Sequence, residues 1–332
     1  MKRDNDLLGL GSVGIACVMT ACLGAFIGMA ADVVGEPEAP GGVADTRGPN
    51  AAYDPYADPD PAEAPALWKL SDEDNTIYLF GTIHLLPPGV EWLTPAYEAA
   101  MQDAGITFAE ADVESPEALA AVGPLIQALG FNPSGVTLSA TLGEERAAKF
   151  SALSERYGVP IAALETMRPW LAILTVTQLV FNQTGLDANS GVDKAVLAAA
   201  REQDDTLGYF ETAEVQVRAL VSFDEEEILK GFDEDLEELL NLEAVVLKLV
   251  DAWRKGDLAW LEAELITETR KETPKTFKAL FTDRNAAWTR QIEEMMAGDQ
   301  NHFIAVGVGH LVGDQSVIDM LVKRGFKPVR IQ

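Results

Sequence analysis

Two of the three histidines in the sequence occur in the same short motif, in which a glycine precedes the histidine by three positions. The motifs pair Gly81 with His84 and Gly307 with His310. Glycine lets the backbone approach a ligand closely or adopt positive φ. A neutral imidazole binds divalent transition metals and is also the usual general base near neutral pH. On the residues alone, the pair indicates either a functional centre or two buried histidines that hydrogen-bond to backbone carbonyls.

Each motif follows an expected strand and precedes an expected helix. Residues 76–81 form an apolar β-type run, and Thr94 with the proline after it is typical of an N-cap and a first helical residue. That helix is expected to end near Ala104, and residues 106–113 predict the next strand. The N-terminal part of the body is therefore expected to be a strand–helix–strand unit.

The C-terminal end repeats this order. Residues 302–308 predict an apolar strand that begins at His302. Asp314 is the expected cap of the next helix, and residues 326–331 predict a last strand. Gly325 suits the position just after that helix. If both units are right-handed parallel crossovers, the two motifs lie at the carboxyl edge of the sheet, where sites in α/β proteins gather.

The segment between the two units is expected to be mainly helical, with one strand at residues 207–210. Helical spacing of apolar residues marks residues 170–181, 192–199, 232–250 and 288–296. We therefore predict an α/β fold with a mixed central sheet, built from two strand–helix–strand halves at the chain ends and a largely helical middle segment. Residues 67–332 are expected to form this single domain.

The N-terminus has the pattern of an export segment. Lys2 and Arg3 precede residues 7–31, which carry no charge and exceed the about 20 apolar residues that span a bilayer. Three fates remain open, namely cleavage after Ala30, lipidation of Cys22 in a lipobox-like stretch, and retention as an anchor. A retained anchor, through residues 7–31 or a lipidated Cys22, is favoured.

Residues 32–66 predict an extended, disordered stalk. Residues 35–65 contain seven prolines among Gly, Ala, Asp and Glu, with almost nothing large and apolar to bury. Together with the export segment at residues 1–31, the stalk predicts a periplasmic or cell-surface domain tethered to the membrane.

Composition excludes several classes of function. The formal net charge is −28, and such a surface repels nucleic acid, so no nucleic-acid partner is expected. Cys17 and Cys22 are the only cysteines, and both lie in the N-terminal segment. Disulfides, thiol catalysis and cysteine-ligated zinc are therefore excluded for the domain. The sequence also has no phosphate-binding loop, zincin helix or serine-hydrolase elbow.

The stretches around the two motifs carry a wider pattern. They are LWKL at residues 67–70, YLFGTIHLLP at 78–87, FAEAD at 108–112, Gly191-Val192-Asp193, Glu211-Thr212, Arg284-Asn285 with Trp288, and AVGVGHLVG at 305–313. Together they resemble the TraB/PrgY/GumN family, which includes the Tiki proteins, over about residues 67–331.

The resemblance implies duplicated α/β halves with an active site between them, and metal-dependent hydrolysis of a peptide or ester bond as in Tiki proteins. It implies that His84 and His310 bind a divalent metal (Mn, Co or Zn), with Glu110 as the third ligand or as the base that deprotonates the metal-bound water. Arg284 is expected to bind a substrate carboxylate or an oxyanion, and Glu211 is a further catalytic candidate. The expected partner is a peptide or a small-molecule substrate.

Alternatives remain open for the function and for two residues. The same site between the two halves would also suit a non-catalytic exported protein that binds a peptide or haem. It would equally suit a hydrolase that works without metal, with His and Glu as acid and base. Arg284 has the alternative of an ordinary ion pair with a carboxylate. Asp193 is expected to interact with a helix dipole rather than to be a ligand.

Overall fold

The computed structural model describes Tyr56 and residues 63–87, 89–183, 190–221, 225–240 and 242–332. The predicted export segment, residues 1–31, lies outside the described residues, and so does most of the predicted stalk. Within the described part of the chain, no helix is both long enough and apolar enough to cross a membrane.

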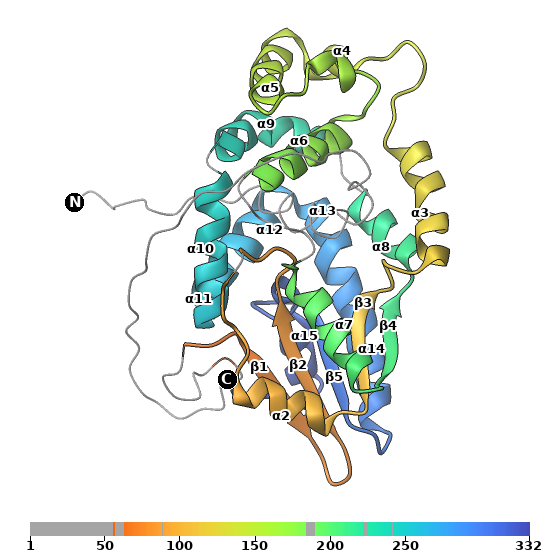
Figure 1. The fold of residues 1–332 in the computed structure, drawn as a ribbon, viewed down its shortest axis with the longest axis vertical. Helices are drawn as coiled ribbons and strands as arrows, with labels where there is room; N and C mark the ends of the chain where they lie inside the picture. Colours follow the sequence, from red (N-terminus) through yellow and green to blue (C-terminus); the bar gives the residue numbers. More distant parts are fainter. Residues whose placement is uncertain (1–55, 57–62, 88, 184–189, 222–224, 241) are drawn as a thin grey trace, which may run out of the picture.

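A six-stranded mixed sheet forms the centre of the fold (Figure 1). Its strands are β1 (Leu67–Ser71), β2 (Thr76–Thr82), β3 (Ile106–Ala111), β4 (Thr206–Glu211), β5 (His302–Gly307) and β6 (Val329–Arg330). In space their order is β4-β3-β5-β2-β1-β6. β2, β5, β3 and β4 are parallel, while β1 is antiparallel to both β2 and β6. The sheet confirms the predicted α/β fold class.

The predicted N-terminal unit is confirmed as β2, α2 (Pro95–Asp103) and β3. Thr94 caps α2, because its side chain accepts a hydrogen bond from the Tyr97 N–H. β5 lies between β2 and β3 and pairs with both of them in parallel. The register sets Thr82 opposite Gly307, so the two histidine motifs lie on adjacent strands at the same carboxyl edge.

The C-terminal unit differs from the prediction in two respects. Ser316, and not Asp314, caps α15 (Val317–Lys323), because the Ser316 side chain accepts from the Asp319 N–H. The last strand is only β6 (Val329–Arg330), and it pairs antiparallel with β1 at the edge of the sheet. The chain does not return beside β5 as a parallel crossover, because β2 and β3 already occupy both sides of β5.

The segment between β3 and β5 is mainly helical, as predicted, and contains β4. Its elements are α3 (Pro116–Leu129), α4 (Leu138–Leu142), α5 (Glu144–Arg156), η1 (Ile161–Ala163), α6 (Pro169–Gln183), α7 (Val192–Glu202), α8 (Ala213–Leu220), α9 (Glu225–Leu240), α10 (Leu242–Lys255), α11 (Leu258–Leu261), η3 (Glu262–Thr267), α12 (Glu268–Glu272), α13 (Pro274–Phe277), η4 (Lys278–Thr282) and α14 (Asp283–Met296). The helix expected over residues 232–250 is divided between α9 and α10. α9 starts early, at Glu225, where three glutamates match the positive end of the helix dipole.

The sheet is fully buried where it carries the two motifs. Every residue of β2 and β5 is buried, and the Trp253 indole on α10 donates to the Gly81 backbone oxygen at 2.8 Å. The predicted stalk also packs on the body near its end, since Ala66 is buried. Upstream, the Tyr56 hydroxyl lies 2.9 Å from Ser316 Oγ. Contacts with the body therefore begin before residue 67.

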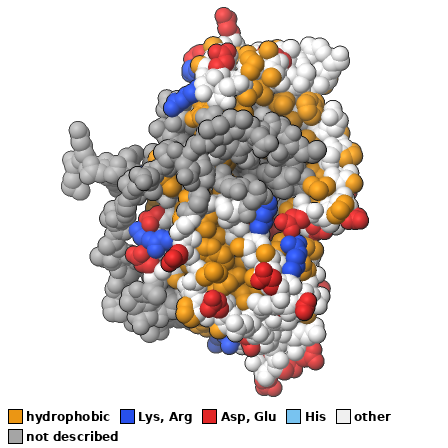
Figure 2. Space-filling model, viewed as in Figure 1, with side chains coloured by type: hydrophobic (Ala, Val, Ile, Leu, Met, Phe, Trp, Pro, Cys, Tyr) orange, Lys and Arg blue, Asp and Glu red, His pale blue; other side chains and the backbone are white. Residues whose placement is uncertain are grey.

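The acidic composition is visible on the surface. Figure 2 shows Asp and Glu side chains spread over one face of the molecule. Some pair with a basic side chain one turn along a helix, as Glu145 does with Lys149 and Glu214 with Arg218. Exposed pairs of this kind contribute little to stability.

Candidate active site

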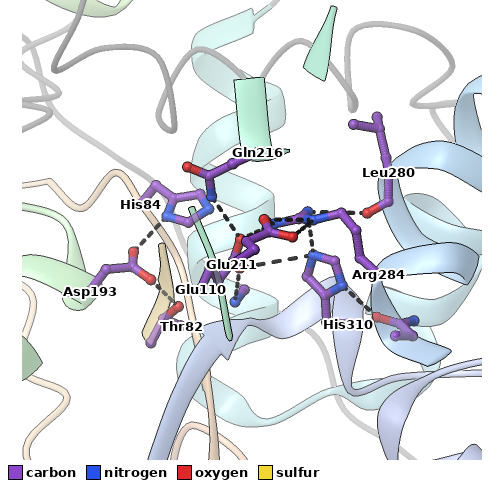
Figure 3. A network of polar contacts seen from close by, with 11 residues as sticks. Thr82, His84, Glu110, Asp193, Glu211, Gln216, Leu280, Arg284 and His310 are labelled. Carbon is purple, nitrogen blue, oxygen red and sulfur yellow. Dashed lines mark hydrogen bonds and ion pairs between the residues drawn. The ribbon is translucent and has the colours of Figure 1, made fainter. Parts of the chain in front are cut away.

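The five residues that the sequence singled out lie together at the carboxyl edge of the sheet (Figure 3). They are His84 after β2, Glu110 on β3, Glu211 at the end of β4, Arg284 on α14 and His310 in η5 (Val308–His310). Hydrogen bonds join Glu110, Glu211 and His310 to Arg284. His84 faces the same centre at Gly307. One polar centre thus contains all the predicted site residues.

A carboxylate from α7 orients His84. Asp193 Oδ2 lies 2.6 Å from His84 Nδ1, and the Thr82 hydroxyl donates to Asp193 Oδ1. Asp193 is in the first turn of α7, as expected for a helix-dipole partner, but it also contacts the imidazole. Gly191 permits this approach, because a Cβ there would lie 2.3 Å from the His84 backbone oxygen. A carboxylate only accepts hydrogen bonds, so neutral His84 carries its proton on Nδ1 and its lone pair on Nε2.

His310 has the same tautomer as His84, with the proton on Nδ1, and its Nε2 is hydrogen-bonded to Arg284. Asn285 Nδ2 donates to the Gln315 backbone oxygen at 2.8 Å, which turns Asn285 Oδ1 toward His310 Nδ1 at 2.6 Å. His310 Nε2 accepts from Arg284 Nη1 at 3.1 Å, because a guanidinium can only donate. Burial lowers the pKa of His310 to about 3, against the opposing effect of Glu110. His310 is therefore neutral near pH 7, and its lone pair is engaged.

Arg284 is buried and directs all of its hydrogen-bond donors to the protein itself. Nε donates to Glu211, Nη1 donates to the Leu280 backbone oxygen and to His310, and Nη2 donates to Glu110 and Glu211. These contacts engage all the N–H groups of a guanidinium. In this arrangement Arg284 has no N–H directed at a substrate. Its contacts match the alternative of an ion pair with carboxylates rather than the expected oxyanion contact.

Glu110 is an ionised acceptor at the base of the centre. Oε1 accepts from the Gly307 N–H at 2.7 Å, and Oε2 accepts from Arg284 Nη2 at 2.7 Å and from Gln216 Nε2 at 3.2 Å. Burial raises the pKa of Glu110, but the Arg284 charge, with smaller contributions from the imidazoles and the Gly307 N–H, outweighs burial and holds this pKa well below its usual range. For Glu211, burial prevails over Arg284 and raises the pKa. Near neutral pH, Glu110 is therefore a fixed negative charge.

The three predicted metal ligands approach one another at Gly307. A Cβ added to Gly307 would lie 3.2 Å from Glu110 Oε1, 3.6 Å from His84 Nε2 and 3.8 Å from His310 Cδ2. Any larger residue at this position would fill the space between these side chains. The glycine of the second motif therefore keeps the centre open at the backbone of β5.

As arranged, these side chains do not fit the predicted three-ligand site for Mn, Co or Zn. His310 Nε2 is 3.9 Å from Glu110 Oε1, but its only lone pair already accepts from Arg284. A metal about 2.1 Å from His310 Nε2 would need that same lone pair. Among the residues that the structure describes, no three His, Cys, Asp or Glu side chains are grouped so that they could hold a metal ion.

The sequence did not predict three of these contacts. They are those of Asp193 with His84, Asn285 with His310, and Gln216 with Glu110. Gln216 is buried on the same face of α8 as Ala213 and Val217, so a lone amide at apolar helical spacing was the available signal. The Asp193 contact has no local signal, because it joins residues 109 positions apart.

The fold and the site together define an α/β protein with a buried centre of histidine, carboxylate and arginine side chains at the carboxyl edge of its sheet. Residues 66–330 match the TraB/PrgY/gumN family, and the chain belongs to that family. It is similar to the uncharacterized protein YbaP of Escherichia coli (strain K12) and to that of Shigella flexneri. Each is 24% identical over 248 residues, which cover 74% of this chain and 87% of the relative. No solved structure matches the chain.

Proposed function

We propose that this protein is a hydrolase that cleaves a peptide or ester bond with a water molecule activated by His84. The observation that carries the proposal is the pairing of His84 Nδ1 with the Asp193 carboxylate, which puts the Nε2 lone pair beside Gly307 and Glu110. An imidazole that a carboxylate orients in this way is suited to take a proton and to carry the resulting charge.

The pair of His84 and Asp193 is the more exposed part of the centre. The side chains of His84 and Asp193 are 15% and 22% exposed, whereas those of Glu110, Arg284 and His310 are between 3% and 8% exposed. A substrate that enters from solvent therefore meets the His84–Asp193 pair before Arg284 and Glu110. Arg284 lies deeper, and its hydrogen bond to Glu110 holds that carboxylate in place.

The proposed reaction needs only water and the substrate. His84 Nε2 takes a proton from water while the water oxygen bonds to the carbonyl carbon, and the carbonyl π electrons move to their oxygen. When the tetrahedral intermediate collapses, the bond to the leaving amine or alcohol breaks, and His84 returns the proton to the leaving atom. The charge of Glu110, which interacts with that of His84, stabilises the transient imidazolium.

Gln216 supplies a further acceptor for the reaction. Its Nε2 must face Glu110, because an ionised carboxylate cannot donate, so the orientation of the amide is fixed. Its Oε1 is buried and has no hydrogen-bond partner among the residues that the structure describes. A buried acceptor of this kind suits the second proton of the water that His84 deprotonates.

We place the reaction outside the cytoplasmic membrane as part of the same proposal. Support comes from Lys2 and Arg3 followed by the uncharged residues 7–31, and from the proline-rich residues 35–65. Cell fractionation of the full chain beside a Cys22→Ala variant tests this part. Recovery of the wild type in the cytoplasmic fraction would contradict it.

The hydrolase proposal is tested with the purified full-length chain, using fluorescein-labelled casein and p-nitrophenyl acetate as probes. We expect turnover by the wild type and a loss of roughly 100-fold or more in His84→Ala. The matched control is His302→Ala, because His302 contacts the Gln300 backbone oxygen and lies outside the centre. Equal rates for wild type and His84→Ala, or saturable peptide binding without turnover, would reject the proposal.

A further inference from the structure

We infer that Arg284 is the resident cation of this centre, that it excludes a divalent metal, and that removing its guanidinium uncovers a metal site formed by His84, His310 and Glu110. The inference concerns what the centre binds, and it holds whether or not the centre is hydrolytic. Three features of the structure carry it, namely the position of the guanidinium, the charges around it and the orientation of the imidazoles.

The guanidinium bridges two of the predicted metal ligands. Nη1 donates to His310 Nε2 at 3.1 Å, and Nη2 donates to Glu110 Oε2 at 2.7 Å. The two ligands are themselves 3.9 Å apart, measured from His310 Nε2 to Glu110 Oε1. The N–H groups of Arg284 therefore engage the His310 lone pair and one Glu110 oxygen, and a metal at these atoms would compete with them.

The charges lead to the same conclusion. Glu110 and Glu211 are the carboxylates beside the guanidinium, and Arg284 forms an ion pair with each of them, at 2.7 and 2.6 Å. All three side chains are at most 8% exposed. In so buried a place a fixed positive charge repels a second cation strongly, since little solvent screens the two charges. A divalent ion would have to displace the guanidinium to bind His310 Nε2 together with Glu110 Oε2.

The imidazoles nevertheless already have the orientation that metal binding requires. His84 donates a hydrogen bond from its Nδ1–H to Asp193, and His310 donates one from its Nδ1–H to Asn285. Histidines that bind metals through Nε2 commonly donate Nδ1–H to a carboxylate or an amide oxygen in this way. Without the guanidinium, His310 Nε2 and Glu110 Oε2 would lose their donor, and His84 Nε2 lies near Glu110 Oε1 at Gly307. Two imidazoles and one carboxylate are a donor set that suits Zn²⁺, Co²⁺ or Mn²⁺.

The variant that tests this is Arg284→Met combined with Glu211→Gln in the full-length chain. Methionine roughly preserves the buried volume, and Glu211→Gln removes the carboxylate that would otherwise lose its partner. The control is Arg218→Met, because Arg218 forms an exposed pair with Glu214 on α8. It removes one positive charge from the same acidic protein, so it corrects for weak metal binding by the surface.

The readouts are isothermal titration with Zn²⁺, Co²⁺ or Mn²⁺ and the metal content after dialysis. We expect the double variant to bind about one equivalent with a Kd at least about 100-fold below that of the wild type and of Arg218→Met. Adding His310→Phe to the double variant should abolish this binding. A folded double variant that binds no metal would overturn the inference that removal of the guanidinium uncovers a metal site, called here the latent site.

The wild type provides a second arm that does not depend on how the variant folds. If the wild type retains one equivalent of metal through dialysis, and His84→Ala or His310→Phe removes it, then Arg284 does not exclude the metal and the inference is wrong. If neither substitution changes the titration of the protein with metal, the result supports the inference. A double variant that folds only when metal is added also supports the latent site, because binding then stabilises the folded state.

Discussion

Protonation of His310 gives a stability test of the centre that needs no substrate. In the folded protein burial lowers the pKa of this imidazole from 6.5 to about 3, so the folded state stays unprotonated where the unfolded chain takes up a proton. Below pH 6.5 the unfolded state therefore binds more protons, and the free energy of unfolding falls as pH falls. Between pH 7.5 and pH 5.0 the loss from His310 alone amounts to about 2 kcal/mol.

The assay is urea denaturation of the full chain at pH 7.5 and 5.0, for the wild type and for His310→Gln. Glutamine does not titrate, so the variant should lose about 2 kcal/mol less than the wild type over this interval. Burial also lowers the pKa of His302, but His302 is present in both proteins and its effect cancels. Equal pH dependence in both proteins would refute the claim that His310 is a neutral acceptor for Arg284.

Three further predictions concern turnover of the casein and p-nitrophenyl acetate probes. Asp193→Asn should lower kcat by roughly 10²–10⁴-fold in a protein that circular dichroism shows to be folded, and an unchanged kcat would show that the carboxylate does not orient the base. Gly307→Ala should lower kcat/KM by roughly 100-fold, because its Cβ would lie 3.2 Å from Glu110 Oε1. The control Gly105→Ala, whose Cβ meets open space, should have no effect. Similar losses in both variants would contradict the claim that Gly307 keeps the centre open. Gln216→Met should lower kcat about tenfold with little change in KM, whereas a loss confined to KM would assign Gln216 to substrate binding.

Local sequence patterns predicted the elements that carry the site. The apolar run before Gly81 is β2, and Thr94 with Pro95 begins α2 as expected. Such features depend on neighbouring residues, so one sequence suffices to predict them. The predicted cap of α15 was wrong, although a cap is also a local feature. Ser316 lies directly before the helix, and Asp314 does not.

The pairings that create the site could not be predicted in the same way. Nothing near His302 indicates that β5 inserts between β2 and β3, since that order depends on contacts across the whole chain. The difference between the two histidines is also non-local. His84 has Asp193 as its partner at Nδ1, whereas His310 is bound to Arg284 at Nε2. Identical motifs therefore have different environments, and only the assembled structure separates them.

The measurement that tests the central claim most directly is steady-state hydrolysis of the two probes by wild type and His84→Ala after exhaustive chelation and dialysis. With His84 as the base and Arg284 as the resident cation, wild-type turnover survives chelation, and His84→Ala loses roughly 100-fold or more. Turnover that chelation abolishes and Zn²⁺, Co²⁺ or Mn²⁺ restores, or that His84→Ala leaves unchanged, would contradict the account.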